Sequence, residues 1–212
     1  MNGLFKRPGR PADAPAAAAS PAATDPVVTS KVFPKFLSAL AQRPVPVLLD
    51  LGPVVGSNIT FFGDRLGCKI YIEDLVADVE AHARRGERDR VAAFFGNRLT
   101  QEPGSVDGIL CWDVFDFLDK AAGQTMAGQL AKLLRPGGAL YGFFGTTPVE
   151  LSSYSRYVVE AEDRLKVRQT PATPLKRHVL LTRDIMKMFD GLNVSESVLL
   201  KSNTRETLFR KQ

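Results

Sequence analysis

The sequence has few cysteines and histidines, the side chains on which most metal sites depend. Its 212 residues include 2 Cys and 2 His, and Cys68 and Cys111 do not form a CxxC pair. Each lies in an apolar stretch that predicts a core strand. Because zinc sites and disulfide frameworks show paired, regularly spaced cysteines, we expect two reduced core thiols in a reducing compartment, with no disulfide and no metal site.

Long apolar runs and dense basic clusters are also missing. No apolar run approaches the roughly 18 to 20 residues that span a bilayer, and the basic N-terminus has no apolar block of the kind a secretory signal carries. We therefore expect a cytoplasmic protein with no membrane contact. The formal net charge is +5, without a block of Lys and Arg interleaved with aromatic residues. Such mild basicity is typical of a solvated surface, so nucleic acid is not an expected partner.

What is present is an ordinary globular composition, preceded by a biased leader. Hydrophobic residues make up 44% and charged residues 24% of the chain, and the length fits one domain. Residues 1–28 are rich in Ala and Pro and predict a disordered leader, because they cannot bury enough apolar surface to offset the entropy of ordering. Residues 29–212 predict the folded domain. The leader is either a flexible extension or an arm that contacts a partner through Phe5, Lys6 and Arg7.

A glycine turn after a short apolar strand is the feature around which the domain is organised. Residues 47–51 are apolar except for Asp50, as expected of a parallel strand buried on both faces. Gly52 and Gly56 follow, where a tight strand-to-helix turn favours residues without a Cβ. Ser57 or Asn58 is predicted to cap the next helix. The pattern is typical of a nucleotide-binding α/β fold.

Strands then alternate with helices through most of the chain. The strand over residues 68–74 ends in two carboxylates. One of them, Glu73, lies about 20 residues past the turn, the spacing at which dinucleotide folds place a ribose-binding acid. This alternation predicts a parallel sheet covered on both faces. The other predicted strands are 90–95, 107–113, 139–144, 193–201 and 205–210. The predicted helices are 30–42, 59–66, 76–86, 119–134 and 182–189. A small hairpin is predicted from 156–159 and 164–168.

Four segments stand out in the order LLDLG with Gly56 (48–56), IE (72–73), SVDGILCWDVF (105–115) and LLRPGG (133–138). Taken in this order, they resemble the class I S-adenosylmethionine-dependent methyltransferases, particularly the small single-domain type. The resemblance covers about residues 30–212. It implies an α/β, Rossmann-like methyltransferase fold with a mostly parallel seven-stranded sheet, an antiparallel C-terminal strand, and helices on both faces. It also implies S-adenosylmethionine as the cofactor.

The resemblance further assigns residues to the cofactor. Glu73 is expected to hold the ribose hydroxyls. Asn97 stands where the family often has an aspartate that meets the adenine amine, and an amide oxygen can still accept that hydrogen bond. Trp112 either stacks on the adenine or fills the core at the end of its strand. The full set of expected cofactor-binding residues is Asp50, Gly52, Gly56, Glu73, Asn97 and Trp112.

Methyl transfer depends largely on positioning, so a conspicuous catalytic group is not required. If the acceptor is a hydroxyl, a base helps, and the candidates are Asp113, Asp116 and His178. Asp113 and Asp116 follow the fourth strand, at the sheet edge where ligands of open α/β folds bind. Asp116 is alternatively a helix-capping or solvent-facing acid. His178, beside two basic residues, is alternatively a surface side chain.

Departures from the family pattern keep a second reading open. Pro53 and Val54 stand in the turn, Val54 in place of the usual middle glycine, so the backbone is expected to approach the cofactor less closely. No Asn/Asp-Pro-Pro-aromatic segment follows strand four, so methylation of DNA bases or glutamine is not indicated. The sequence therefore predicts a methyltransferase acting on a small molecule or a protein side chain. The alternatives are a catalytically inactive binding or regulatory module of the same fold and, more distantly, a nicotinamide dehydrogenase. The acceptor itself would be selected by residues 146–178 and the first helix.

Overall fold

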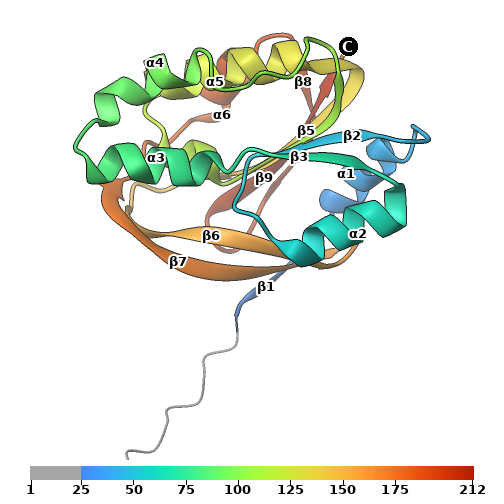
Figure 1. Cartoon of the computed structure of the whole chain (residues 1–212). Helices are drawn as coiled ribbons and strands as arrows, with labels where there is room; N and C mark the ends of the chain where they lie inside the picture. The colour runs from blue at the N-terminus through green and yellow to red at the C-terminus, as the bar shows by residue number, and fades with distance from the viewer. Residues whose placement is uncertain (1–24) are drawn as a thin grey trace, which may run out of the picture.

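The computed structural model describes residues 25–212, which form two sheets (Figure 1). The main sheet has six strands in the order β3-β2-β4-β5-β9-β8, and the second has three in the order β1-β7-β6. The main-sheet strands are β2 Val47–Asp50, β3 Lys69–Ile72, β4 Val106–Trp112, β5 Leu134–Gly145, β8 Leu192–Leu199 and β9 Thr204–Lys211. The second sheet consists of β1 Val27–Thr29, β6 Glu150–Ala161 and β7 Arg164–Lys176. The helices are α1 Phe33–Leu40, α2 Gly56–Leu66, α3 Leu75–Arg84, α4 Val91–Phe95, α5 Lys120–Leu133 and α6 Thr182–Met188, with 3₁₀ turns η1 Arg88–Arg90 and η2 Val114–Phe117.

The main sheet is mostly parallel. Strands β3, β2, β4 and β5 pair in parallel, whereas the C-terminal strand β9 runs antiparallel to both β5 and β8. All seven residues of β4 are buried, which explains its unbroken apolar sequence. The predicted α/β, Rossmann-like architecture with an antiparallel C-terminal strand is confirmed.

Two hydrophobic clusters cover the two faces of the main sheet. On one face, α1 and α2 pack together with side chains of the second sheet, including Tyr157 and Leu165. On the other face, α3, α4, α5 and α6 pack against β4 and β5 through residues such as Val79, Phe95 and Leu130. Figure 1 shows α3, α4 and α5 gathered on one side, with α1 and α2 on the other. The second sheet therefore belongs to the same core as the first helices.

The predicted strand over residues 90–95 is wrong. These residues form the end of η1 and all of α4. Val91 and Phe95 are buried, whereas Ala93 and Phe94 between them are exposed, and a spacing of four places the two buried side chains on one helical face. An apolar run this short fits a buried strand and a helix turn equally well by its sequence. Within residues 25–212 the main sheet consequently has six strands, not the seven predicted.

Two residues before position 29, where the domain was predicted to start, belong to a strand. Val27 and Val28 in β1 pair antiparallel with Lys166 and Leu165 of β7. β-branched side chains favour this extended conformation, and Val28 packs against the cluster under the second sheet. The rest of the predicted leader, residues 1–24 with Phe5, Lys6 and Arg7, lies outside the described residues. The division into leader and domain stays a prediction.

A side-chain hydroxyl binds the first N–H groups of α1, whereas α2 has no such contact. The Ser30 hydroxyl accepts hydrogen bonds from the N–H groups of Val32 (3.1 Å) and Phe33 (2.7 Å) just before α1. Helix α2 begins at Gly56 without a side-chain cap, so the prediction that Ser57 or Asn58 caps it is wrong. Asn58 lies inside the helix, and its buried amide bonds to β6 instead, a longer-range contact that outweighs the local preference.

The predicted hairpin is confirmed and is longer than expected. Arg156 faces Arg168 and Val159 faces Leu165 across it, but the strands extend to residues 150 and 176. Cys111 is buried in β4 and Cys68, half-buried, precedes β3; both are free thiols. Within residues 25–212, no helix has the length and apolarity to cross a membrane, and no cluster of His, Cys, Asp or Glu is arranged to hold a metal ion.

Candidate functional site

The site begins at Asp50, the last residue of β2. This strand lies between β3 and β4, so its carboxyl end is the point where the chain crosses to opposite sides of the sheet, the usual ligand position in open α/β folds. Asp50 Oδ1 accepts hydrogen bonds from Gly52 N (2.9 Å) and Trp112 Nε1 (2.7 Å). Burial raises the pKa of Asp50 to about 7, although both hydrogen bonds oppose the shift and Asp74 adds to it. The acid inside this apolar strand is thus hydrogen-bonded to the turn and to the indole.

Trp112 lies directly on the glycine turn. A Cβ added to Gly52 would lie 2.5 Å from Trp112 Cδ1, so only glycine fits beneath the indole. Trp112 has a left-handed backbone conformation with a φ of 48°, which is uncommon for a bulky residue. The indole is 3% exposed. By contrast, a Cβ on Gly56 would meet nothing within 4 Å, so the turn itself does not demand glycine at that position.

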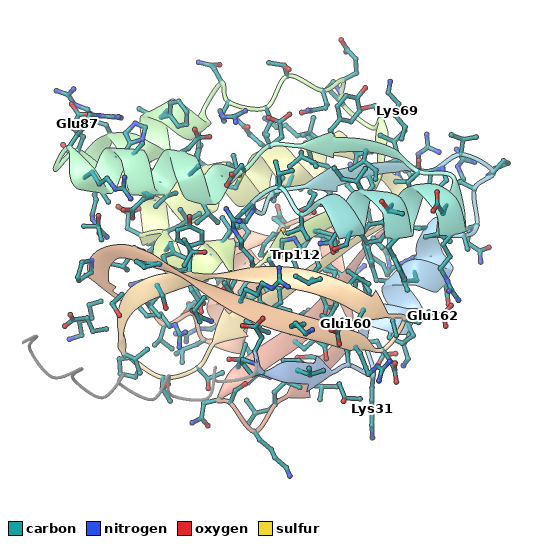
Figure 2. The ribbon with its side chains drawn as sticks, turned by 60° about the horizontal axis from the view of Figure 1, so that its bottom comes forward. Lys31, Lys69, Glu87, Trp112, Glu160 and Glu162 are labelled. Atoms are coloured by element: carbon teal, nitrogen blue, oxygen red, sulfur yellow. The ribbon has the colours of Figure 1, made fainter. Side chains whose placement is uncertain are left out.

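An aromatic stack continues from the indole into the second sheet. Trp112 stacks on Tyr157 of β6 with ring centroids 5.0 Å apart and an interplanar angle of 6°, and Tyr157 stacks on Phe143 at 4.9 Å and 15°. Figure 2 shows Trp112 beside β6. In this conformation the side chain fills the core at the end of its strand. Its contact with adenine stays a prediction.

The side chain of Asn58 holds β6 beside the turn by hydrogen bonds. Its side-chain amide donates to Tyr157 O (2.8 Å), and its Oδ1 accepts from Val159 N (2.8 Å). The amide therefore replaces part of a strand ladder and is 3% exposed. Through Asn58 and the aromatic stack, α2 and β4 hold the β6–β7 hairpin against the glycine turn. No local sequence signal indicates this contact, because its partners are about a hundred residues apart.

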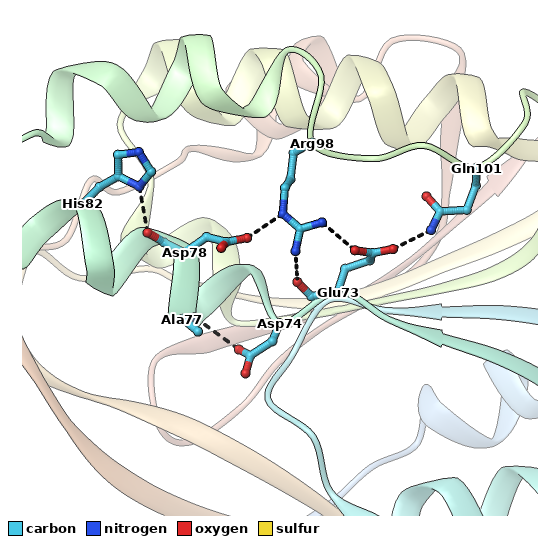
Figure 3. Close-up of polar contacts among 7 residues, drawn as sticks. All are labelled: Glu73, Asp74, Ala77, Asp78, His82, Arg98 and Gln101. Atoms are coloured by element: carbon cyan, nitrogen blue, oxygen red, sulfur yellow. Dashed lines mark hydrogen bonds and ion pairs between the residues drawn. The ribbon is translucent and has the colours of Figure 1, made fainter.

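Glu73 lies next to the turn, as predicted, but its carboxylate already has partners. Its N–H donates to Asp50 O (2.9 Å). Its side chain accepts hydrogen bonds from Arg98 and Gln101, while Arg98 Nη2 also donates to the Glu73 carbonyl (2.8 Å) (Figure 3). Arg98 Nε reaches Asp78 at 2.7 Å. The sequence reasoning missed both Arg98 and Gln101, which come from the irregular segment after α4.

Asn97 does not lie at a strand end, because the expected third strand is helix α4. It follows that helix and is exposed. Its neighbour Arg98, not Asn97, carries the contact with Glu73. The proposed role of Asn97 at the adenine stays a prediction.

Two buried carboxyl groups follow β4. Asp116 Oδ1 accepts from Gly145 N (2.8 Å), and Oδ2 lies 2.9 Å from Arg177 Nε. Burial raises the pKa of Asp116 to about 6 despite the charge of Arg177. Burial and the neighbouring Asp116 raise the pKa of Asp113 to about 7, opposed by the hydroxyls of Ser155 and Tyr157. Asp113 Oδ1 has no hydrogen-bond partner among residues 25–212. Perturbed, incompletely bonded acids at a sheet edge are typical of functional sites.

The third predicted base lies apart from this pair of acids. His178 is exposed and lines a separate cleft with Lys176 and Asp119. The structure thus brings Asp113 and Asp116 together with Tyr157 and Arg177, which the sequence reasoning did not connect to them. It does not place His178 in the same group.

The comparisons with known proteins identify the fold. No family model matches the sequence, and no curated protein matches it. Solved structures do match. An S-adenosylmethionine-dependent methyltransferase from Methanosarcina mazei has a TM-score of 0.51 and 10% identity, covering 87% of this chain and 98% of that one. The 1,6-didemethyltoxoflavin-N1-methyltransferase of Burkholderia thailandensis has a TM-score of 0.50 and 18% identity, covering 86% and 77%.

A protein from Pyrococcus horikoshii matches with a TM-score of 0.50 and 12% identity, covering 84% of this chain and 89% of that one. At such identities the matches concern the fold. The chain therefore has the class I S-adenosylmethionine-dependent methyltransferase fold.

Proposed function

We propose that the protein is an S-adenosylmethionine-dependent methyltransferase acting on a small molecule or a protein side chain. One observation carries the proposal: the Asp50–Gly52 turn follows β2, and Glu73, whose N–H donates to the Asp50 carbonyl, directly follows the neighbouring strand β3. This places a turn without a Cβ and a carboxylate side by side at the switch point of the sheet, where such folds bind nucleotide-like ligands.

The residues present suit the cofactor chemically. Glu73 offers carboxylate oxygens to ribose hydroxyls, with Arg98 and Gln101 as neighbours that would hold the carboxylate in place or give way to the hydroxyls. Because Gly52 has no side chain, its backbone would be accessible to the cofactor once the Trp112 indole is displaced. S-adenosylmethionine would supply an activated methyl group. Binding accordingly requires the stack of Trp112 and Tyr157 to open.

The chain's own contribution to the reaction would be positioning and proton transfer. The Asp113 carboxyl, with a pKa near 7 and an unpaired oxygen, is suited to accept a proton from an acceptor hydroxyl near neutral pH. Asp116, fixed by Arg177 and the Gly145 N–H, would hold its neighbour's pKa up and is a positioning group. Tyr157 and the hairpin would exclude water from the acids.

A second candidate function is a catalytically inactive module of the same fold that binds partners. The observations in its favour are that Trp112 covers Gly52 and that both oxygens of the Glu73 carboxylate are bonded within the chain. Val54, in place of the family's middle glycine, is 57% exposed. In this reading the closed turn is the permanent state of the protein.

Titration with S-adenosylhomocysteine separates the two functions. Trp112 is the only tryptophan in the chain, so its intrinsic fluorescence reports directly on the turn while calorimetry measures the affinity. We expect saturable binding with a fluorescence change, and Glu73→Ala should weaken it by about 1 to 3 kcal/mol, the cost of leaving buried polar groups unpaired. The matched control is Glu102→Ala, an exposed acid in a loop. Binding undetectable at millimolar ligand would refute the enzyme and favour the inactive module.

A further inference from the structure

A cleft lies beside the N-terminus of α5, outside the proposed cofactor site. Its volume is about 460 Å³, within the range of small-molecule sites. None of the residues assigned above to the cofactor or to proton transfer lines it, apart from His178. The walls come from α3, η1, α4, η2, the first turn of α5 and the end of β7: Val79, Arg88, Val91, Phe117, Leu118, Asp119, Ala122, Pro174, Leu175, Lys176 and His178.

The floor of the cleft is apolar. Val79, Val91, Phe117 and Leu118 contribute side chains that are each 9% exposed or less. They belong to the larger hydrophobic cluster of this face of the sheet, so the floor is held by the core. An apolar ligand body of a few carbon atoms or one ring would find a preformed surface here.

The rim of the cleft carries excess positive charge. Arg88 and Lys176 line it, against one carboxylate, Asp119, whose Oδ1 accepts from Ala122 N. Within residues 25–212, neither Arg88 nor Lys176 has a carboxylate within ion-pair distance. The arginines around Arg88 differ in this respect. Arg84, Arg85 and Arg90 each pair with a glutamate.

Arg88 is held in place although it lacks an acidic partner. Its Nη2 donates to the carbonyls of Thr173 and Pro174, each at 3.2 Å. Glu80 of α3 in turn binds the Thr173 N–H and hydroxyl, both at 2.9 Å, which ties the end of β7 to the helix. The guanidinium is therefore positioned by neutral carbonyls and keeps its full charge for a ligand.

We propose that this cleft binds a small amphipathic carboxylate, with its apolar body on the Val79–Phe117 floor and its acid group between Arg88 and Lys176. Charge complementarity favours a carboxylate, which can accept from the Arg88 nitrogens that the two carbonyls leave free, Nη1 and Nε. The site does not depend on S-adenosylmethionine. It would exist equally in a methyltransferase and in an inactive module.

The test uses three probes that share one apolar body. The full chain is titrated with 4-phenylbutyrate, 4-phenylbutanol and 4-phenylbutylamine, and binding is followed by calorimetry and by amide chemical shifts in NMR. We expect saturable binding of the carboxylate, with shifts concentrated at residues of the cleft. Affinity should be at least about tenfold lower for the alcohol, which carries no charge to pair with the rim, and for the amine, which the rim repels.

Variants that remove the positive charges of the rim test whether the carboxylate binds there. The pair Arg88→Gln and Lys176→Gln should lower carboxylate affinity by about tenfold or more, whereas the matched pair Lys31→Gln and Lys201→Gln, two exposed lysines outside the cleft, should leave it unchanged. Circular dichroism checks that each variant folds, and the single variant Lys176→Gln serves if the double variant does not. No carboxylate binding, equal binding of the amine, or an equal loss in the control pair would overturn the proposal. Because S-adenosylhomocysteine is absent from these titrations, a failure here is distinct from a failure of the proposed function.

Discussion

Replacing Asp50 by asparagine should make the stability of the protein less sensitive to pH. The Asp50 carboxyl is 5% exposed, and burial raises its pKa to about 7 from an ordinary value of 3.8. Asparagine keeps the oxygen that accepts from Gly52 N and Trp112 Nε1, and it has no proton to lose near neutral pH. The variant therefore removes one titration from a site whose geometry it preserves.

The direction of the effect follows from proton linkage. The folded protein holds the Asp50 proton up to a higher pH than the unfolded chain does. The stability linked to this proton is complete below pH 3.8 and is lost as the pH rises through about 7. A pKa shift of one unit corresponds to about 1.4 kcal/mol, so the difference between the unfolded and folded pKa values of Asp50 changes the unfolding free energy by about 4 kcal/mol at most. That is a large share of a typical unfolding free energy of about 5 to 15 kcal/mol.

Urea denaturation at several pH values between 4.5 and 8 measures the effect. The difference in unfolding free energy, Asp50→Asn minus wild type, should grow by about 1 kcal/mol per pH unit between pH 5 and 6.5 and level off above pH 7. Taking the difference cancels the contribution of the other buried acids to the pH dependence of the unfolding free energy, because they remain in both proteins. A difference that stays constant with pH would refute the reasoning, because it would mean that Asp50 titrates alike in the folded and unfolded chains.

Three further substitutions test contacts around the turn, each by urea denaturation. Asn58→Ala removes both bonds to β6 and should cost about 1 to 3 kcal/mol, against almost nothing for the exposed neighbour Ser57→Ala. Gly52→Ala forces a Cβ against the Trp112 indole and should cost about 1 to 3 kcal/mol, whereas Gly128→Ala, with open space in α5, should be neutral or stabilising. Arg177→Met leaves Asp116 without its partner and should cost about 3 to 5 kcal/mol at pH 8 and less at pH 5, where the carboxyl is protonated, whereas Arg183→Met, mostly exposed, should change little. A control variant that costs as much as its test variant would contradict the assigned contact in each pair.

The sequence predicts the parts of this fold that depend on local patterns. The apolar run ending at Asp50, the acid at Glu73 and the alternation of strands and helices all reflect short-range periodicity, and each element lies within a few residues of its predicted place. The failure at residues 90–95 is also local. Val91 and Phe95 fit the core as a helical pair, but a run of six residues does not distinguish a period of two from one of 3.6.

The contacts that close the site lie beyond such patterns. Arg98 reaches back to Glu73 across 25 residues, and Arg177 reaches Asp116 across the sheet edge. The position of Asn58 in the sequence predicts a helix cap. Its side-chain amide instead hydrogen-bonds to a strand about a hundred residues further along the chain. A single sequence contains no signal for which distant backbone groups lack partners, and those groups decide where such polar side chains bond.

The contacts that close the glycine turn are therefore the same contacts that control a ligand's access to it. The Trp112 indole bonds to Asp50, covers Gly52 and stacks on Tyr157, which Asn58 holds in place. Any ligand that binds on Gly52 must displace the indole. The left-handed backbone of Trp112 lowers the free energy needed to move this residue out of its closed position, because such conformations store about 1 to 3 kcal/mol of strain. Contacts that hold the indole on Gly52 thus both stabilise the folded domain and oppose ligand binding at the turn. Weakening the Asn58 bonds should lower stability and raise the affinity of an active cofactor site together, since a ligand that selects the open state binds more tightly as that state becomes more populated. In a permanently closed module, only the stability would change.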